Sequence, residues 1–389
     1  MKTRLWLTDM DGLRQLEAMA GVQHTPAYVV DEKKLIENCE ILQSVQEHTG
    51  CKILLAQKAF SMFRVYPIIS QYLAGTTASG LFEARLGREK FAGEVHVFEP
   101  AYKYEDICEI VDTADYVYFN SLRQLENFGH ICREAGKQIG LRINPECSTQ
   151  DTTIYDPCAV GSRLGVRAED LTKFPDIDGI HFHTLCEQGA DALEITLKAV
   201  EEKFGKYLHL CKWVNFGGGH HITKKGYDIP LLEKLITDFQ QKYDVQVYLE
   251  PGEAIALNAG YLVTEIMDIV HNGMDILILD ASASCHMPDV LEMPYRPPLF
   301  ESGMPDEKQY TYRLSSCTCL AGDVVGDYSF DNPLHIGDRL CFEDMAIYSM
   351  VKNNTFNGMP LPDIGILHVN GDYEVVKHFG YSDFKERLS

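Results

Sequence analysis

The chain has 389 residues, of which 35 are basic and 57 acidic, so that its formal net charge is −22. This excess of carboxylates argues against binding to nucleic-acid backbones or anionic membranes, and it suits a cationic small-molecule substrate. A chain of this length usually forms two domains, and a hydrophobic share of 45% is enough for a large core. No apolar run approaches the roughly 20 residues of a membrane span.

The N-terminal stretch and the cysteines indicate the compartment. Residues 1–15 contain two aspartates and no sustained apolar segment, so we expect no signal peptide. The twelve cysteines are scattered through the chain and are expected to be reduced thiols. A cytoplasmic location follows from both expectations. The Cys317-Thr318-Cys319 spacing has no second cysteine pair near it and is weak as a zinc site.

The first two thirds of the chain alternate between strand and helix patterns. A short β-like run at 25–30 precedes a helical pattern at 31–48. Strands are predicted at 53–56, 76–79, 94–99, 116–120, 138–144, 179–183, 213–216 and 245–250. Helices are predicted at 63–73, 81–91, 104–112, 122–135, 190–207 and 231–243. This alternation predicts a parallel α/β barrel, with a doubly wound sheet as the alternative.

The pattern changes after about residue 267, where turn signals crowd together and short β-rich runs replace helices. Strands are expected at 275–280, 309–314, 339–342 and 365–369. This texture predicts an antiparallel β domain. The connection at 145–178 has little periodicity, and a loop of that length is usually functional or mobile.

Lys58 follows the apolar run at 53–56, which reads as a strand buried on both faces. Catalytic groups of α/β barrels lie at the C-terminal ends of the strands. A desolvated lysine there has a lowered pKa, and its neutral amine can form a Schiff base with a carbonyl cofactor. The alternative is a lysine that has just emerged into solvent.

Three further strand ends carry unusual residues. His181 and His183 lie two apart on one strand and face the same way, so either could stack on an aromatic cofactor. With His220 and His221 they could instead bind a metal, and for His181 we expect a satisfied core histidine. The run from Gly217 to Gly219 allows close backbone approach to a phosphate, or is simply a flexible loop.

Glu250 ends the eighth predicted strand, where a buried carboxylate needs a cation or a strong donor. A protonated pyridine nitrogen would serve as that cation. A Schiff-base lysine, a stacking histidine, phosphate-binding glycines and a carboxylate for a pyridinium are together the four parts of a pyridoxal 5′-phosphate (PLP) site.

The motifs around these residues resemble those of the fold-type III PLP decarboxylases of ornithine and diaminopimelate. The matching motifs are Lys58 in Ala-Gln-Lys-Ala, His183 in His-Phe-His-Thr, Gly217 to Gly219, and Glu250 in Glu-Pro-Gly, followed by Cys319 in Ser-Cys-Thr-Cys-Leu-Ala-Gly-Asp and Tyr348 in Ala-Ile-Tyr-Ser-Met. The resemblance covers about residues 28–358. Segments 284–289 and 293–297 resemble members whose substrates are amino acids with a polyamine tail.

The resemblance implies an alanine racemase-like architecture, with a PLP-binding (β/α)8 barrel at 31–266 and a β domain formed by 1–30 and 267–389. It implies that Lys58 carries the Schiff base and that Cys319, contributed across a homodimer interface, is the acid near Cα. The other implied cofactor contacts are His183 with the ring, Glu250 with its nitrogen, and Gly217, Gly218, Gly219, Ser162 and Tyr348 with the phosphate.

Glu253 departs from the family pattern, because ornithine and diaminopimelate decarboxylases carry an arginine there. An acidic residue repels phosphate and attracts a cationic amine, so we expect Glu253 and Asp289 to bind the tail of the substrate. The role of Arg296 stays open. Competing interpretations are decarboxylation of diaminopimelate or ornithine, racemisation, a non-catalytic regulator with the same fold, and a metal-dependent barrel hydrolase.

Overall fold

The computed structural model describes residues 10–150 and 153–389, and the chain divides into two compact units. Residues 36–255 form the first, here called the barrel unit; residues up to 35 and from 256 onward form the second, here called the sheet unit. Residues 1–9 of the predicted β domain and residues 151–152 of the predicted long connection lie outside the described residues.

The barrel unit is built on eight parallel strands in the described part of the chain. They are β2 (Lys52–Ala56), β3 (Gly75–Ala78), β4 (Glu94–Phe98), β5 (Tyr116–Phe119), β6 (Gln138–Asn144), β8 (Gly179–His181), β9 (Trp213–Asn215) and β10 (Gln246–Leu249). They pair in the order β5-β4-β3-β2-β10-β9-β8-β6, and β5 also pairs with β6. This last pairing closes the sheet, so the predicted barrel is confirmed and the doubly wound alternative is wrong.

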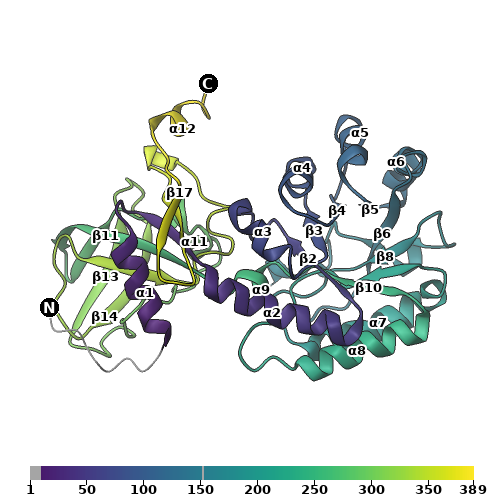
Figure 1. The fold of residues 1–389 in the computed structure, drawn as a ribbon, viewed down its shortest axis with the longest axis horizontal. Helices are drawn as coiled ribbons and strands as arrows, with labels where there is room; N and C mark the ends of the chain where they lie inside the picture. Colours follow the sequence, from purple (N-terminus) through teal and green to yellow (C-terminus); the bar gives the residue numbers. More distant parts are fainter. Residues whose placement is uncertain (1–9, 151–152) are drawn as a thin grey trace. The chain divides into compact units, whose positions relative to one another are not determined.

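Helices connect these strands and lie around the outside of the barrel (Figure 1). They are α2 (Glu32–Thr49), α3 (Tyr66–Ile69), α4 (Leu81–Lys90), α5 (Tyr104–Thr113), α6 (Leu122–Glu134), α7 (Ala190–Leu208) and α8 (Ile229–Tyr243). The short elements of this unit are η1 (Phe63–Val65), η2 (Thr153–Tyr155), β7 (Val166–Arg167), η3 (Ala168–Asp170) and α9 (Glu253–Ala256).

Helix α8 shows how local sequence sets these connections. Its N-cap Asp228 accepts a hydrogen bond from the N–H of Leu231 at 3.0 Å, which satisfies a donor that the first helical turn leaves open. The buried residues Leu232, Ile236 and Phe239 recur every three or four positions and form the face against the barrel. The helix ends at Asp244, whose φ of 55° is left-handed.

The sheet unit contains β1 (Ala27–Asp31), β11 (Gly260–His271), β12 (Asp275–Leu279), β13 (Tyr310–Ser316), β14 (Val324–Phe330), β15 (Arg339–Glu343), β16 (Asp363–Leu367) and β17 (Tyr373–Lys377). The strand order is β14-β13-β12-β11-β1-β16-β17, and β15 also pairs with β11. Most pairs are antiparallel as predicted, whereas β1–β16 and β12–β13 are parallel, so the sheet is mixed. The sequence did not predict β11, β14 or β17.

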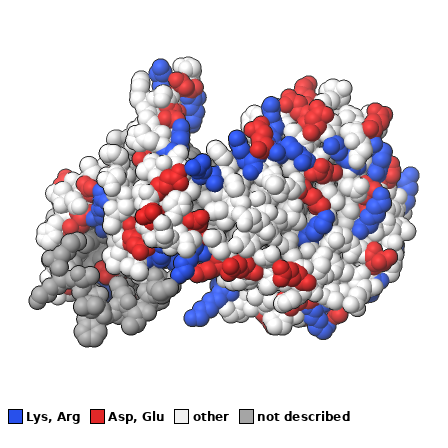
Figure 2. Space-filling model, in the orientation of Figure 1, with Lys and Arg blue, Asp and Glu red and all other residues white. Residues whose placement is uncertain are grey.

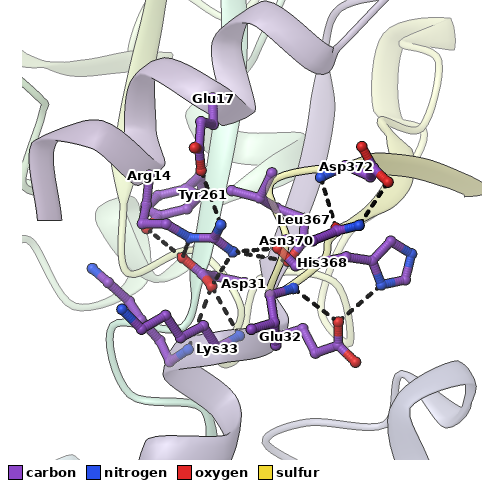
Figure 3. A network of polar contacts seen from close by, with 12 residues as sticks. Arg14, Glu17, Asp31, Glu32, Lys33, Tyr261, Leu367, His368, Asn370 and Asp372 are labelled. Carbon is purple, nitrogen blue, oxygen red and sulfur yellow. Dashed lines mark hydrogen bonds and ion pairs between the residues drawn. The ribbon is translucent and has the colours of Figure 1, made fainter. Parts of the chain in front are cut away.

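Short helices complete the sheet unit: α1 (Met10–Gly21), α10 (Ala283–His286), α11 (Asp289–Glu292), η4 (Phe356–Gly358) and α12 (Tyr381–Lys385). Arg14 of α1 forms a bidentate ion pair with Asp31 at the end of β1, with Nε–Oδ2 and Nη2–Oδ1 distances of 2.9 and 2.7 Å (Figure 3). Its Nη2 also donates to the carbonyls of Leu367 and His368. One buried guanidinium thus joins α1, β1 and the end of β16.

Acidic and basic side chains are interspersed over the described residues on the faces that Figure 2 draws. Among the described residues, no helix combines the length and the apolar character that crossing a membrane requires.

Candidate active site

A cavity of about 270 Å³ lies in the barrel unit, among the C-terminal ends of its strands. Its ionisable lining residues are Lys58, Arg142, Arg163, His181, His183 and Glu250. The structure therefore brings together three of the predicted site residues, Lys58, His183 and Glu250, which come from three different strand ends.

Lys58 lies in the turn that follows β2 and its side chain faces the cavity. The Lys58 side chain is accessible to solvent from the cavity, but it is otherwise surrounded by protein atoms. This enclosure lowers the pKa of the Lys58 amine, and the nearby Arg142 guanidinium lowers it further. Both effects favour the neutral amine, which is the form that attacks a carbonyl.

Both carboxylate oxygens of Glu250 have partners. Oε1 accepts from the Asn215 amide at 2.8 Å, and Oε2 lies 3.2 Å from His181 Nε2. Burial acts to raise the pKa of Glu250, but His181 and the Asn215 hydrogen bond outweigh it and hold this pKa at about 2. Because burial lowers the pKa of His181, the imidazole is neutral and donates its Nε2–H to the ionised carboxylate. A negative charge is therefore fixed beside the cavity.

His181 corrects one prediction. We expected a satisfied core histidine, but its Nε2 bonds Glu250 while its Nδ1, which is buried, has no hydrogen-bond partner among the described residues. The reason is that His181 packs its ring flat against Tyr118, with centroids 5.0 Å apart, and reaches Glu250 with one nitrogen only.

His183 is held by the glycine triplet. The Gly218 N–H donates to His183 Nδ1 at 3.0 Å, so this nitrogen carries no proton. Burial and the neighbouring Lys58 lower the pKa of His183 well below its ordinary value, and the ring is neutral. Arg142 donates to the His183 carbonyl at 3.1 Å and fixes the backbone at the same point. The imidazole is thus rigid and uncharged at the cavity wall.

The triplet itself needs glycine for two reasons. Gly217 and Gly219 have φ values of +71° and +81°, which favour glycine, and a Cβ on Gly219 would lie 1.9 Å from the carbonyl oxygen of Leu185. The N–H groups of Gly217 and Gly218 are already committed to Asn215 and His183. Fewer N–H groups of the triplet are therefore open to a ligand than the sequence suggested, and its binding of a phosphate stays a prediction.

Arg142 and Arg163 were not singled out from the sequence, yet both line the cavity. Burial lowers the pKa of Arg142 only to about 10, so it is a cation at neutral pH, and it lies 4.6 Å above the ring of Phe98. Two guanidinium groups make this part of the cavity attractive to a phosphate or carboxylate. A signal was present for Arg142, because it is a charge between the apolar residues Leu141 and Ile143 of the buried strand β6.

Two further predicted residues belong to the barrel unit. Ser162 Oγ accepts from the N–H of Leu164 at 3.2 Å, and Leu164 lines the cavity. Glu253 begins α9, three residues after Glu250, and is partly buried. His220 and His221 are buried, and among the described residues no group of three or more His, Cys, Asp and Glu side chains is arranged to hold a metal.

The remaining predicted residues belong to the sheet unit. Cys319 is exposed in the turn after β13, with its Sγ 3.7 Å from Asn357 Nδ2. Tyr348 is partly buried and has a left-handed φ of 53°. Asp289 pairs with Lys352, which also contacts Glu292 at 2.8 Å.

Arg296, whose role the sequence left open, uses its guanidinium within the sheet unit. It donates to the carbonyl of Gly303 at 3.2 Å and lies 4.4 Å from the centre of the Tyr328 ring. These contacts are those of a structural arginine.

A lysine amine with a lowered pKa and an ionised carboxylate, both lining a cavity at the strand ends of an α/β barrel, are typical of enzymes that work through a carbonyl cofactor. Comparison with known proteins places the chain among them. A family model described as "Pyridoxal-dependent decarboxylase, C-terminal sheet domain" matches residues 27–346. The chain belongs to this family of PLP-dependent carboxy-lyases, and PLP is its cofactor.

Similar proteins include a carboxynorspermidine/carboxyspermidine decarboxylase of Campylobacter jejuni, 44% identical, with 93% of this chain and 98% of the relative covered. A carboxyaminopropylagmatine decarboxylase of Synechocystis is 42% identical, with 94% and 95% covered. The crystal structure of carboxynorspermidine decarboxylase from Campylobacter jejuni, complexed with norspermidine, superposes with a TM-score of 0.88 and 43% identity, over 94% of this chain and all of that chain.

The residues in the cavity fit PLP. An aldehyde needs a neutral amine, a pyridinium needs a fixed negative charge, and a phosphate needs cations or N–H donors. Lys58, Glu250 and Arg142 supply one of each in the barrel unit. When bound, PLP takes up the electron pair of the bond that breaks.

Proposed function

We propose that the chain decarboxylates carboxynorspermidine and carboxyspermidine, giving norspermidine and spermidine in polyamine biosynthesis. The α-carboxylate leaves as CO2, and a proton replaces it on the same carbon. The observation that carries the proposal is the similarity to the Campylobacter jejuni enzyme, which extends over nearly the whole of both chains. The net charge of −22 supports a substrate with several ammonium groups.

The site residues take the following roles in this proposal. Lys58 holds PLP through its amine, and Glu250 keeps the ring nitrogen protonated. His183 lies against the ring as a neutral, rigid surface. After CO2 has left, Cys319 or Lys58 delivers the proton to Cα.

The phosphate of PLP is held by several groups together. Gly217, Gly218 and Gly219 allow its close approach, and Ser162 and Tyr348 contribute hydroxyl groups. The positive charge of Arg142 and Arg163 supports this assignment, because both line the same cavity as Lys58. These guanidinium groups compensate for Glu253, which stands where relatives of the ornithine and diaminopimelate type carry an arginine.

Glu253 and Asp289 bind the ammonium groups of the substrate tail. Glu253 is supported by its position three residues after Glu250, at the start of α9. Asp289 already pairs with Lys352, so a substrate ammonium must share this carboxylate with a lysine or displace it.

A second candidate substrate is carboxyaminopropylagmatine, because the Synechocystis relative is almost as similar as the one from Campylobacter jejuni. Agmatine ends in a guanidinium group, whereas spermidine and norspermidine end in primary amines. Both tails are cationic, and both suit a carboxylate such as that of Glu253. Diaminopimelate and ornithine are weaker alternatives, since an acidic residue replaces the family arginine.

The test is a substrate panel with the purified, PLP-loaded protein. We expect kcat/KM to be highest for carboxynorspermidine or carboxyspermidine, with the decarboxylated amine identified by chromatography. Glu253→Gln should raise KM for these substrates by about tenfold, because it removes one charge-assisted contact. Preferred turnover of diaminopimelate or ornithine would contradict the proposal, and preference for carboxyaminopropylagmatine would select the second candidate.

We also infer a cytoplasmic homodimer with each active site at the subunit interface. The twelve cysteines are all free thiols, which supports a reducing compartment. The dimer is supported by the family resemblance, in which Cys319 reaches the site of the partner subunit. Sedimentation of the PLP-loaded protein tests the oligomeric state.

A further inference from the structure

Asn215, the last residue of β9, is fully buried and uses its whole amide group. Its Nδ2 donates to Glu250 Oε1 at 2.8 Å and to the Tyr118 hydroxyl oxygen at 3.1 Å. Its Oδ1 accepts the N–H of Gly217 at 2.8 Å. One side chain therefore joins the carboxylate of the site to the first residue of the glycine triplet.

The hydrogen bonds continue from Tyr118 into the barrel with a fixed direction. The ionised Glu94 carboxylate can only accept, so the neutral His96 ring donates to it from Nε2 and accepts the Tyr118 hydrogen at Nδ1, with which that hydroxyl is in close contact. Nε2 of His96 then carries the proton and lies 3.2 Å from Oε2 of Glu94. Lys52 pairs with the other oxygen of Glu94 at 2.5 Å.

This sequence of contacts, Asn215–Tyr118–His96–Glu94, is here called the barrel chain. Glu94 is the first residue of β4 and Asn215 the last of β9, so the barrel chain crosses the barrel from one end of the strands to the other. The interior of such barrels is usually filled by branched aliphatic residues. Buried polar groups cost free energy unless every one is paired, so this polar interior is not the simplest way to pack a barrel.

Tyr118 supports both protein partners of Glu250. Its hydroxyl holds Asn215, and its ring stacks on His181 with an interplanar angle of 5°. Asn215 and His181 in turn contact one oxygen each of the Glu250 carboxylate. The orientation of that carboxylate is thus set from two sides by groups that a single tyrosine fixes.

We propose that Asn215 is a positioning residue that holds Glu250 and the Gly217 turn at one fixed separation, and that the barrel chain through Tyr118 and His96 to Glu94 holds Asn215 itself in place. The proposal rests on the proposed function only in so far as Glu250 and the glycine triplet contact PLP. Without the amide, Glu250 Oε1 and the Gly217 N–H both lose their partner.

The test compares two substitutions that each remove one hydroxyl group from neighbouring tyrosines of β5. Tyr118→Phe breaks the barrel chain and keeps the ring that stacks on His181. Tyr116→Phe is the matched control, because the Tyr116 hydroxyl bonds that of Tyr248 at 2.9 Å in the same barrel interior. The measurements are the dissociation constant of PLP from equilibrium dialysis, the thermal unfolding temperature of the PLP-free protein, and kcat and KM.

We expect Tyr118→Phe to weaken PLP binding by about tenfold or more, by analogy with metal sites, where the loss of a supporting hydrogen bond has an effect of this size. It should lower kcat with KM for the substrate unchanged, while Tyr116→Phe binds PLP like the wild type. Equal PLP affinity in the two variants would overturn the proposal, since the barrel chain would then serve packing alone. PLP affinity is measured without substrate, so a wrong substrate assignment leaves this result unchanged.

Asn215→Asp provides a second measurement. It keeps an oxygen for the Gly217 N–H but places a carboxylate against Glu250, and we expect PLP affinity to fall further than in Tyr118→Phe. Wild-type affinity in a folded Asn215→Asp protein would overturn the proposal. If Asn215→Asp does not fold, the comparison of Tyr118→Phe with Tyr116→Phe decides.

Discussion

Lys52 and Lys58 lie at opposite ends of the same barrel strand. Lys52 begins β2 and its amine pairs with Glu94 at 2.5 Å, whereas Lys58 follows the end of β2 and lines the cavity. The two residues are six positions apart, yet Lys52 has a carboxylate partner, whereas burial and the nearby Arg142 lower the pKa of the Lys58 amine. The chain therefore carries an internal control for the role of the active-site lysine.

Lys58→Ala should abolish turnover and the absorbance band that PLP shows when it is joined to a lysine. The reason is that no other amine replaces Lys58 among the lining residues of the cavity. The measurement is an absorbance spectrum of the purified protein after addition of PLP, followed by a CO2-release assay.

Lys52→Ala is the control for this experiment. It should keep the absorbance band, because Lys52 lies at the far end of the strand. Turnover by a folded Lys58→Ala protein at a rate near that of the wild type would refute the assignment.

The low pKa of Glu250 predicts that the protein becomes less stable as the pH falls. Its pKa is about 2 in the folded protein, below its ordinary value of 4.5, so its contribution to stability is complete above about pH 5 and declines as the pH falls from 4.5 towards 2. Urea unfolding of the PLP-free wild type and of Glu250→Gln measures this contribution as a difference. We expect the difference to shrink by about 2 kcal/mol between pH 6 and pH 3. A difference that is constant over this range would mean that Glu250 does not titrate as described.

The ion pair of Arg14 and Asp31 is expected to contribute to the stability of the sheet unit. Asp31 is fully buried and Arg14 is 6% exposed, so Arg14→Ala leaves a carboxylate without its main partner inside the protein. We expect a loss of about 3–5 kcal/mol in the free energy of unfolding. Arg313→Ala removes the half-exposed bidentate pair with Asp327 and should cost less than about 1 kcal/mol. Equal losses in chemical unfolding would contradict the prediction.

Asp323 is an acceptor for four hydroxyl groups. The hydroxyls of Ser282, Ser284, Ser316 and Thr318 all lie 2.6–2.9 Å from its Oδ2, and the side chain is 1% exposed. Burial acts to raise the pKa of Asp323, but these hydrogen bonds outweigh it and the pKa is lowered. The carboxylate is therefore ionised and joins two segments of the sheet unit.

Asp323→Asn should lower the free energy of unfolding by about 2 kcal/mol, because an amide oxygen is a weaker acceptor and its NH2 group faces donors. Thr318 directly precedes Cys319, so the same substitution should also change the rate at which a thiol reagent labels Cys319. Asp327→Asn, at a partly buried carboxylate outside this cluster, is the control. Unchanged stability together with an unchanged labelling rate would show that the hydrogen bonds of the four hydroxyls neither stabilise the protein nor affect Cys319.

Mixed dimers test whether Cys319 acts in the site of the partner subunit. Lys58→Ala and Cys319→Ala should each be nearly inactive alone. After equal mixing and subunit exchange, half of the dimers are mixed and each holds one intact site, so about a quarter of wild-type activity should return. Mass spectrometry shows whether the subunits have exchanged. If they have exchanged and no activity returns, Cys319 acts in the site of its own subunit.

The sequence was most informative where a local pattern carries a local consequence. Lys58, His183 and Glu250 each follow an apolar strand, and the geometry of a parallel barrel brings such strand ends to one cavity. Asn215 was missed because it lies inside the strand predicted at 213–216, where no local pattern shows what its side chain contacts. Only the three-dimensional structure shows that its amide reaches Glu250, which is 35 residues away along the chain.

The sheet unit was harder to predict for related reasons. Strand β11 spans 12 residues and runs across residue 267, where the change from the barrel to the β domain was predicted. Strand β14 contains Gly326 and Ser329, which are typical of turns, and β17 is a largely exposed edge strand. Pairing with distant strands, rather than local preference, decides these segments.

Strand β1 has a consequence for synthesis of the chain on the ribosome. It lies between β11 and β16, pairing with residues 260–263 on one side and 363–367 on the other. The barrel unit is complete once residue 255 has emerged, whereas β1, made among the first residues, gains its first partner at residues 260–263 and its second only at residues 363–367. A nascent chain truncated before residue 363 therefore exposes an apolar strand edge, and we expect chaperones to bind it there until translation ends.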